Sequence, residues 1–158
     1  MSNPATTATL PAIEASTYIN ASAEKVYAAI STSEGWNAWF TQKTELDLRP
    51  GGKIWLVWRD WGVNHVDHED GGKILEVENN RKLSFEWHAD LHSKTVVTFT
   101  LTPHGSGTIL KVTDEGYRPE ELTKFAGFAD CCLGWGEAIT LLKFYVEHGV
   151  TYGTVPKK

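Results

Sequence analysis

The apolar positions near the C-terminus recur at steps of three and four residues. This spacing predicts a long helix from Pro119 to Gly149, because proline suits a first turn and glycine suits a helix end. The positions that share one broad face of it are Phe128, Cys131, Cys132, Trp135, Ala138, Ile139, Leu142, Tyr145 and Val146. Burying a large apolar side chain contributes about 1.5–3 kcal/mol, so such a face needs a matching surface. We expect that surface to be a β-sheet.

A row of small residues lies beside the large ones in the first half of this predicted helix. Steps of four, three and four from Gly127 give Cys131, Gly134 and Ala138. A glycine inside a helix costs about 1 kcal/mol relative to alanine, so the row needs a reason. One interpretation is close backbone packing against the sheet. The other is that this half of the helix covers an unfilled space.

The pattern before the long helix predicts a strand, two short helices and a run of strands. Ile13 to Ile19 alternates between apolar and polar residues, as in a strand with one buried face. Short helices are predicted from Ala23 to Ile30, capped by Ser22, and from Ser33 to Phe40. The further strands predicted are Glu45 to Leu48, Lys53 to Asp60, Val63 to Glu69, Lys73 to Glu78, Lys82 to His88, Thr95 to Thr102 and Thr108 to Glu115.

This order of elements predicts the α+β class. Consecutive strands with short turns form an antiparallel meander, and one curved sheet can wrap around a single helix. We expect a helix-grip fold: a curved antiparallel sheet of about six or seven strands around the long C-terminal helix, with two short helices after the first strand. The predicted organisation is a flexible tail over residues 1–11, one domain over 12–150 and a second tail over 151–158. A sheet of this shape often leaves a binding cavity inside it.

Composition and charge disfavour several classes of function. The chain has 158 residues, of which 41% are hydrophobic, which suits one domain with a sizeable core. The formal charge of −5 disfavours nucleic acid and anionic membrane surfaces as partners. No apolar run approaches the roughly 20 residues of a membrane helix, and the first residues lack the pattern of a signal peptide. We therefore predict a cytoplasmic protein.

Histidines and cysteines are the residues to examine for chemistry. Cys131 and Cys132 are adjacent on the predicted helix, so we expect buried free thiols and not a disulfide or a metal pair. The stretches 64–70 and 88–92 are rich in histidine and aspartate, but neither has a metal-ligand spacing. We expect most of these side chains at a solvated rim, with His68 and Arg59 as polar anchors inside. No cofactor, metal or catalytic residue is predicted.

Several motifs, in their order along residues 13–149, are similar to one known family. They are Ile19 to Ser22 leading into Val26-Tyr27, Trp36 to Phe40, Arg49 to Gly52, Gly72 to Val77, Leu83 to Trp87, Thr95 to Thr102, Gly107-Thr108, and Gly134-Trp135 through Leu141-Leu142 to Glu147-His148-Gly149. The chain resembles bacterial proteins similar to the C-terminal domain of the activator of heat shock protein 90 ATPase, within the START-like (SRPBCC) superfamily. The resemblance implies a helix-grip fold with an apolar cavity. Because the superfamily includes lipid carriers, hormone receptors, polyketide cyclases and chaperone cofactors, it implies no single reaction.

We therefore predict binding of an apolar or aromatic small molecule, such as a lipid, a flavonoid or a polyketide-like compound, between the sheet and the first half of the long helix. The predicted ligand-binding residues are Trp39, Phe40, Trp58, Arg59, His68, Leu75, Trp87, Phe99, Phe128, Cys131, Gly134 and Trp135.

The sequence leaves two alternative functions open, and it leaves the role of one surface undecided. The alternatives are a cyclase- or dehydratase-type enzyme that uses His68 or His65, and an interaction module that resembles a chaperone cofactor. Leu133 and Phe144 lie almost in line on the outer side of the long helix. They are interpreted as residues covered by the N-terminal tail, as scattered surface residues, or as a contact with a second copy or a chaperone.

Overall fold

Seven antiparallel strands form one sheet in the computed structural model of the chain, which describes residues 8–88 and 93–152. Their order across the sheet is β1-β7-β6-β5-β4-β3-β2. The elements are β1 (Ile13–Ile19), α1 (Ala23–Ile30), α2 (Ser33–Trp39), β2 (Lys43–Leu46), β3 (Lys53–Trp61), β4 (Val66–Glu78), β5 (Lys82–Trp87), β6 (Thr95–His104), β7 (Gly107–Glu115), the 3-10 turn η1 (Pro119–Glu121) and α3 (Phe128–His148).

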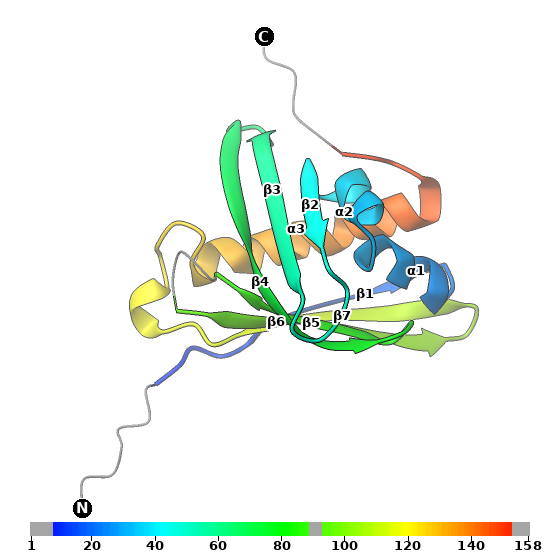
Figure 1. Cartoon of the computed structure of the whole chain (residues 1–158), viewed down its shortest axis with the longest axis horizontal. Coiled ribbons are helices and arrows are strands. Elements are labelled where there is room, and N and C mark those ends of the chain that lie inside the picture. Colours follow the sequence, from blue (N-terminus) through cyan, green and yellow to red (C-terminus); the bar gives the residue numbers. More distant parts are fainter. Residues whose placement is uncertain (1–7, 89–92, 153–158) are drawn as a thin grey trace, which may run out of the picture.

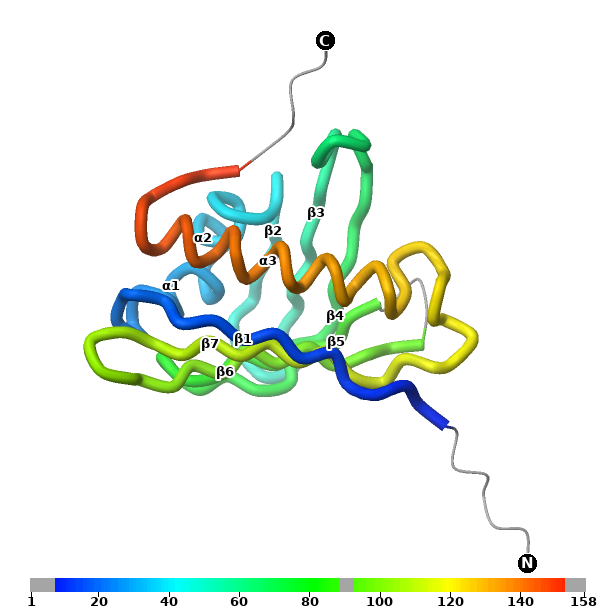
Figure 2. The backbone as a smooth tube through the Cα atoms, turned by 180° about the vertical axis from the view of Figure 1, so that it is seen from behind, coloured from blue at the N-terminus to red at the C-terminus, as the bar shows by residue number. Residues whose placement is uncertain are grey.

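The sheet curves around α3, and α1 and α2 lie together near the C-terminal part of that helix (Figure 1). From the other side, α3 runs along β1, and the β3–β4 hairpin rises past its first half (Figure 2). This architecture confirms the predicted α+β helix-grip fold with two short helices after the first strand. No helix in residues 8–88 or 93–152 is long and apolar enough to cross a bilayer.

The C-terminal helix begins nine residues later than the sequence pattern predicts. Pro119 opens only the short turn η1, and α3 begins at Phe128. Gly127, the residue before it, packs so closely that an added Cβ would lie 2.2 Å from the carbonyl oxygen of Glu121. The chain therefore folds back on itself here and does not continue one helix. The predicted end is correct, since Gly149 closes α3 with φ of 69°.

One long strand replaces two predicted ones. The sequence predicts strands on either side of a bulge or turn at Gly71-Gly72, whereas β4 is continuous through both glycines. Gly71 has φ of 150°, and a Cβ there would lie 2.1 Å from the carbonyl oxygen of Ile54 on β3. Gly71 thus allows β3 and β4 to pair closely, with Leu56 opposite Asp70.

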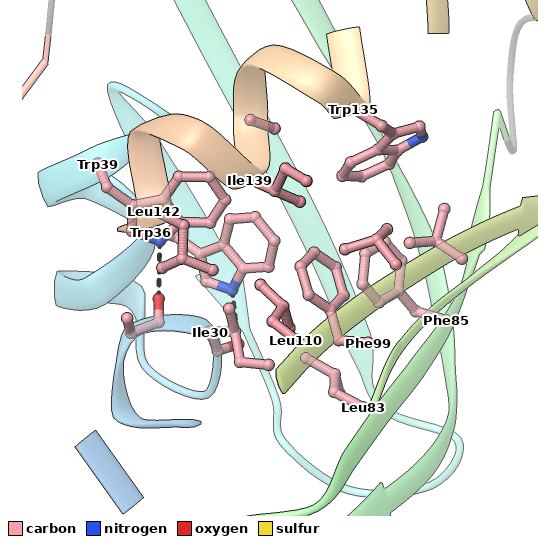
Figure 3. Close-up of a cluster of buried hydrophobic side chains, with 14 of the residues drawn as sticks. Ile30, Trp36, Trp39, Leu83, Phe85, Phe99, Leu110, Trp135, Ile139 and Leu142 are labelled. Carbon is pink, nitrogen blue, oxygen red and sulfur yellow. Dashed lines mark hydrogen bonds between the residues drawn. The ribbon is translucent and has the colours of Figure 1, made fainter. Parts of the chain in front are cut away.

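The packed core lies between the sheet and the C-terminal half of α3 (Figure 3). Trp36 and Trp39 are fully buried, and their indole nitrogens donate to the backbone carbonyls of Ile30 at 2.7 Å and Ala29 at 2.9 Å. These hydrogen bonds satisfy the two polar groups that burial of tryptophan brings inside. The indoles then fill this end of the fold.

Domain boundaries stay a prediction. The single domain predicted for residues 12–150 includes residues 89–92, which lie outside the described residues together with 1–7 and 153–158. Most of both predicted tails, and most of the second histidine-containing stretch (88–92), therefore lie outside the described residues.

Candidate functional site

A cavity of about 260 Å³ lies between the first half of α3 and the β3–β4 hairpin. An apolar cavity of about 150 Å³ can hold benzene, so this volume suits a small molecule with one or two rings. The residues that line it are Phe40, Trp58, Trp61, Val66, His68, Asp70, Trp87, His88, Phe125, Ala126, Asp130, Cys131, Gly134, Trp135 and Glu137. Phe125 is exposed, so the cavity reaches the surface beside the segment that precedes α3.

The walls of the cavity are aromatic rings that hold one another in place. Trp58 on β3 stands edge-on to Trp87 on β5, with centroids 6.2 Å apart, and Trp87 lies 5.7 Å from Trp135 on α3. Phe40, at the end of α2, packs against Trp58 at 5.2 Å and accepts a hydrogen bond from its indole nitrogen through the backbone carbonyl. Rings from four separate elements thus converge on the cavity, and they are well suited to contact a flat aromatic ligand.

Strand periodicity brings His68 and Asp70 to the same face of β4. Alternate residues of a strand point to the same side of the sheet, so both side chains face the cavity. The His68 ring stacks on Trp58, with centroids 5.6 Å apart, and its Nε2 lies 3.6 Å from Oδ2 of Asp70. His68 therefore places a polar atom among the aromatic walls.

Asp70 is buried and has polar partners for both carboxylate oxygens. Oδ2 lies 2.7 Å from Nδ1 of His88, while Oδ1 accepts hydrogen bonds from the backbone N–H groups of Gly71 and His88. Burial acts to raise the pKa of Asp70, but the hydrogen bonds from His68 and His88 outweigh it and lower the pKa below its ordinary value. Asp70 is therefore a buried negative charge beside an apolar cavity.

A second buried carboxyl group lies on the far side of His88. The hydroxyl of Tyr117 lies 2.8 Å from His88 Nε2 and donates to Asp114 Oδ2 at 2.7 Å. The same oxygen accepts a hydrogen bond from Trp135 Nε1 at 2.9 Å. Burial raises the pKa of Asp114, and its hydrogen bonds offset this only in part. Asp70, His88, Tyr117 and Asp114 thus form a row of polar side chains with an aspartate at each end. The pKa values of the two aspartates are shifted in opposite directions, an arrangement often found where proteins move protons.

One group of possible metal ligands occurs in the described residues. His88, Asp114 and Cys131 each offer a ligand atom, and these atoms lie within 4.8 Å of one another. The Tyr117 hydroxyl, however, hydrogen-bonds with both His88 and Asp114. A metal ion would have to displace it, so we explain this group as a hydrogen-bonded network.

The structure brings most, but not all, of the predicted site residues together. Those that line the cavity are Phe40, Trp58, His68, Trp87, Cys131, Gly134 and Trp135. Those that lie elsewhere are Trp39, Arg59, Leu75, Phe99 and Phe128.

The five residues outside the cavity have identifiable positions. Trp39 and Phe99 belong to the packed core, and Phe128 packs edge-on against Tyr117. Leu75 is half-buried where the pairing of β4 with β5 becomes irregular. Arg59 lies on the outer face of β3, because it is one residue away from the inward-facing Trp58.

Arg59 has its own partner on that outer face. Its guanidinium forms an ion pair with Glu69, which also accepts a hydrogen bond from Trp55. These two hydrogen bonds, from Trp55 and then from Arg59, lower the pKa of the Glu69 carboxyl. His65 is also outside the cavity, with its Nδ1 2.7 Å from Asp60.

Sequence reasoning missed several residues of the site. His88 was expected at a solvated rim, but only 1% of its surface is exposed, and its φ of 59° turns it inward at the end of β5. The other lining residues that were not predicted for the site are Trp61, Val66, Asp70, Phe125, Ala126, Asp130 and Glu137. Asp70 belongs to the stretch 64–70 that was expected at a solvated rim, but it is buried. Its two-residue separation from His68 on one strand was a usable signal.

Gly134 borders open space. A Cβ added to Gly134 would have no heavy atom within 4 Å, so close backbone packing does not explain this glycine. Gly127 and Ala138 differ from it, since Gly127 approaches Glu121 closely and Ala138 is buried. Close packing therefore explains Gly127, whereas Gly134 is an exposed position at the opening of the cavity.

Comparison with protein families and solved structures supports the assignment of this fold. The family model described as Activator of Hsp90 ATPase homolog 1-like protein matches residues 20–147. The comparison with curated proteins gave no match.

Solved structures from several bacteria share the fold. The solution structure of protein BH1534 from Bacillus halodurans is 30% identical, with a TM-score of 0.67, and the match covers 88% of this chain and 99% of that one. Protein MLL2253 from Mesorhizobium loti is 25% identical, with a TM-score of 0.69 and coverages of 84% and 94%. The Aha1 dimer from Colwellia psychrerythraea is 22% identical, with a TM-score of 0.73 and coverages of 89% and 98%.

Proposed function

The chain belongs to the Activator of Hsp90 ATPase homolog 1-like family, and from this premise we propose that it binds an apolar, aromatic small molecule in the cavity beside α3. The observation that carries the proposal is the aromatic lining of a cavity that opens to the surface beside Gly134, where no heavy atom lies within 4 Å of an added Cβ. Filling such a space with an apolar ligand removes apolar surface from water.

The chemistry of the walls indicates the class of ligand. The edge-on and tilted rings of Trp58, Trp87 and Trp135 favour a flat aromatic group. His68 offers one polar contact among them, so we propose a ligand with a single hydroxyl or carbonyl group beside its ring. A flavonoid fragment or an aromatic polyketide fits this description better than a long acyl chain.

The indole N–H signals of the seven tryptophans provide the test. Those of Trp58, Trp61, Trp87 and Trp135 come from cavity residues, whereas those of Trp36, Trp39 and Trp55 come from residues outside the cavity. We would titrate the nitrogen-15-labelled protein with 4-phenyl-2-butanone, a one-ring ketone. Saturable shifts in the first set and not in the second are expected. Shifts in the second set alone, or in neither, would refute this site.

An enzyme of cyclase or dehydratase type is the second candidate function, and the pairing of His68 with the buried Asp70 favours it. An imidazole in an apolar cavity can move a proton during loss of water from a β-hydroxy ketone. The test is conversion of 4-hydroxy-4-phenyl-2-butanone to the enone, followed by ultraviolet absorbance. The reaction is expected to be faster with the wild-type protein than with His68→Gln, and equal rates would rule out this role for His68.

We also propose a contact between two copies of the chain through the outer side of α3. Leu133 and Phe144 are 78% and 43% exposed and lie almost in line on this helix, so together they offer an apolar contact surface. The similar Colwellia psychrerythraea structure is a dimer. A contact with a chaperone would use the same residues. The two cases can be told apart because a dimer forms when the concentration of this protein alone is raised, whereas a chaperone complex needs the chaperone.

A further inference from the structure

The sulfur atom of Cys131 lies next to the His88–Asp70 pair. Its Sγ is 3.7 Å from His88 Nε2, and the opposite nitrogen of that ring, Nδ1, is 2.7 Å from Asp70 Oδ2. Cys131 and His88 both line the cavity. A thiol, an imidazole and a buried carboxylate in this order are the components of an activated nucleophile.

We propose that Cys131 forms a covalent bond with an aromatic α,β-unsaturated ketone or aldehyde bound in the cavity, and that His88 is the base that accepts the thiol proton. This inference rests on the proposed binding of an aromatic molecule at the same place. It adds a reaction to that binding, and it identifies the ligand class as an electrophile.

The surroundings of His88 favour uptake of a proton. Once the ring carries protons on both nitrogens, Nδ1–H faces the Asp70 carboxylate and Nε2–H faces the Tyr117 oxygen, 2.8 Å away. The base role requires the neutral tautomer that has its proton on Nδ1, beside Asp70. Because the Tyr117 hydroxyl donates to Asp114, its oxygen accepts from Nε2–H once the thiol proton has moved there. Both N–H groups of the imidazolium therefore have acceptors that are already in position.

The thiol itself is held in its protonated form at rest. Burial raises the pKa of Cys131 to about 12, although hydrogen bonds from Tyr117 and Trp87 act in the opposite direction. The S–H group lies 3.3 Å from the carbonyl oxygen of Ala126, which accepts its hydrogen bond. The proton must therefore leave as the new bond forms, and a base 3.7 Å from the sulfur is suited to take it.

The reaction is an addition in which nothing is oxidised or reduced and no group leaves. The S–H proton passes to Nε2 of His88, and the sulfur electron pair forms a bond to the β-carbon of the enone. The carbon–carbon π pair moves toward the carbonyl oxygen and gives an enolate. The enolate then takes a proton at the α-carbon from the imidazolium, which restores His88 and leaves a saturated thioether.

Cys132 is a built-in control. It is adjacent to Cys131, but it is exposed and does not line the cavity. A small polar reagent such as iodoacetamide is expected to modify Cys132 first because it needs no pocket. An aromatic enone that occupies the cavity is expected to reverse this preference.

The experiment uses the full chain and 4-phenyl-3-buten-2-one, with peptide mass spectrometry to locate the adduct. We expect one added molecule on Cys131, in excess over Cys132, and inhibition by the saturated ketone 4-phenyl-2-butanone. Cys131→Ser is expected to abolish this adduct, whereas Cys132→Ser leaves it unchanged. Adducts on Cys132 alone, or equal labelling of both thiols, would overturn the proposal.

A His88 variant tests the base. His88→Asn is the suitable change because asparagine also adopts the positive φ found at this position. Loss of general-base catalysis is expected to slow the Cys131 adduct by about 100-fold or more. If the variant fails to fold, as judged by circular dichroism, the ratio of Cys131 to Cys132 labelling in the wild-type protein still decides the proposal.

The saturated ketone separates this inference from the proposed binding function. If 4-phenyl-2-butanone shifts the cavity tryptophan signals and the enone gives no adduct on Cys131, the nucleophile proposal fails and the binding proposal stands. If neither compound affects the cavity residues, the binding proposal fails and takes the covalent one with it.

Discussion

His88 Nδ1 and Asp70 Oδ2 lie 2.7 Å apart, and the two side chains are only 1% and 2% exposed. A buried carboxylate of this kind is costly unless it is paired, because removal of a charge from water costs several kcal/mol. The pairing with His88 and with two backbone N–H groups meets that cost. The same two side chains therefore contribute to the stability of the fold and line the cavity.

Replacement of Asp70 by asparagine is expected to destabilise the protein at pH 7. Each hydrogen bond to a buried charged group contributes about 1.5–3 kcal/mol, and the amide of asparagine cannot replace all of those that the Asp70 carboxylate accepts. The folded pKa of Asp70 lies below its ordinary value of 3.8, so its stabilising contribution is present above that value and is lost as the pH falls through the folded pKa. Urea denaturation would show a larger difference between wild type and Asp70→Asn at pH 7 than at pH 3. A difference that is the same at both pH values would contradict this account.

Asp114→Asn is the matched comparison, because the pKa of Asp114 is shifted in the opposite direction from that of Asp70. Its folded pKa is raised, so the carboxyl favours folding most below 3.8, and that contribution is lost as the pH rises through the folded pKa. An amide keeps an acceptor for Trp135 and needs no charge. We therefore expect Asp114→Asn to change the free energy of unfolding at pH 7 by less than about 1 kcal/mol. A loss as large as that of Asp70→Asn would show that the charge on Asp114 is required.

Two glycines near the start of α3 should respond in opposite ways to alanine. Gly127→Ala puts a Cβ 2.2 Å from the carbonyl oxygen of Glu121, and overpacking of this kind costs about 1–3 kcal/mol. Gly134→Ala meets no atom within 4 Å and gains about 1 kcal/mol of helix propensity. Thermal unfolding by circular dichroism measures both changes. A stabilised Gly127→Ala would mean that the chain can relax away from Glu121.

The outer side of α3 gives a prediction about self-association. Leu133→Glu places a charge on a side chain position that is 78% exposed, so it should leave the fold intact and abolish any dimer formed through this surface. Ala28→Glu, on an exposed position of α1, is the control with the same change of charge. Light scattering over a range of protein concentrations would follow the molar mass. A dimer that both variants retain would place the contact elsewhere.

Periodicity in the sequence was enough to predict the sheet, the short helices and much of the cavity wall. Trp58 and Trp87 sit at inward positions of alternating strands, and Trp135 lies on the buried face of the C-terminal helix, so local pattern identifies all three. Arg59 was predicted to point inside because it adjoins strand residues of the interior. This reasoning was wrong, since neighbouring residues of a strand point to opposite faces of the sheet.

Features that depend on distant contacts were not predictable in this way. The break at Gly127 depends on the position of the Glu121 carbonyl, which only the folded chain defines. His88 was assigned to the rim because it follows a strand, yet its positive φ and its bond to Asp70 place it inside. Neither a left-handed backbone at histidine nor a partner 18 residues away leaves a periodic signal.

The central claim is that a ligand occupies the space beside Gly134, and a pair of glycine variants tests it most directly. Gly134→Leu puts a large side chain at the lining of the cavity, while Gly136→Leu, two residues along the same helix, adds the same side chain outside the cavity. Both glycines are exposed. Neither added Cβ meets an atom within 4 Å, and both changes raise helix propensity, so stability does not separate the two.

The measurement is the dissociation constant of 4-phenyl-2-butanone by isothermal titration calorimetry. We predict that Gly134→Leu weakens binding by at least about 10-fold, which corresponds to about 1.4 kcal/mol, and that Gly136→Leu binds as the wild type does. Equal affinities for all three proteins would contradict the account, because the ligand would then bind somewhere other than the cavity between α3 and the β3–β4 hairpin.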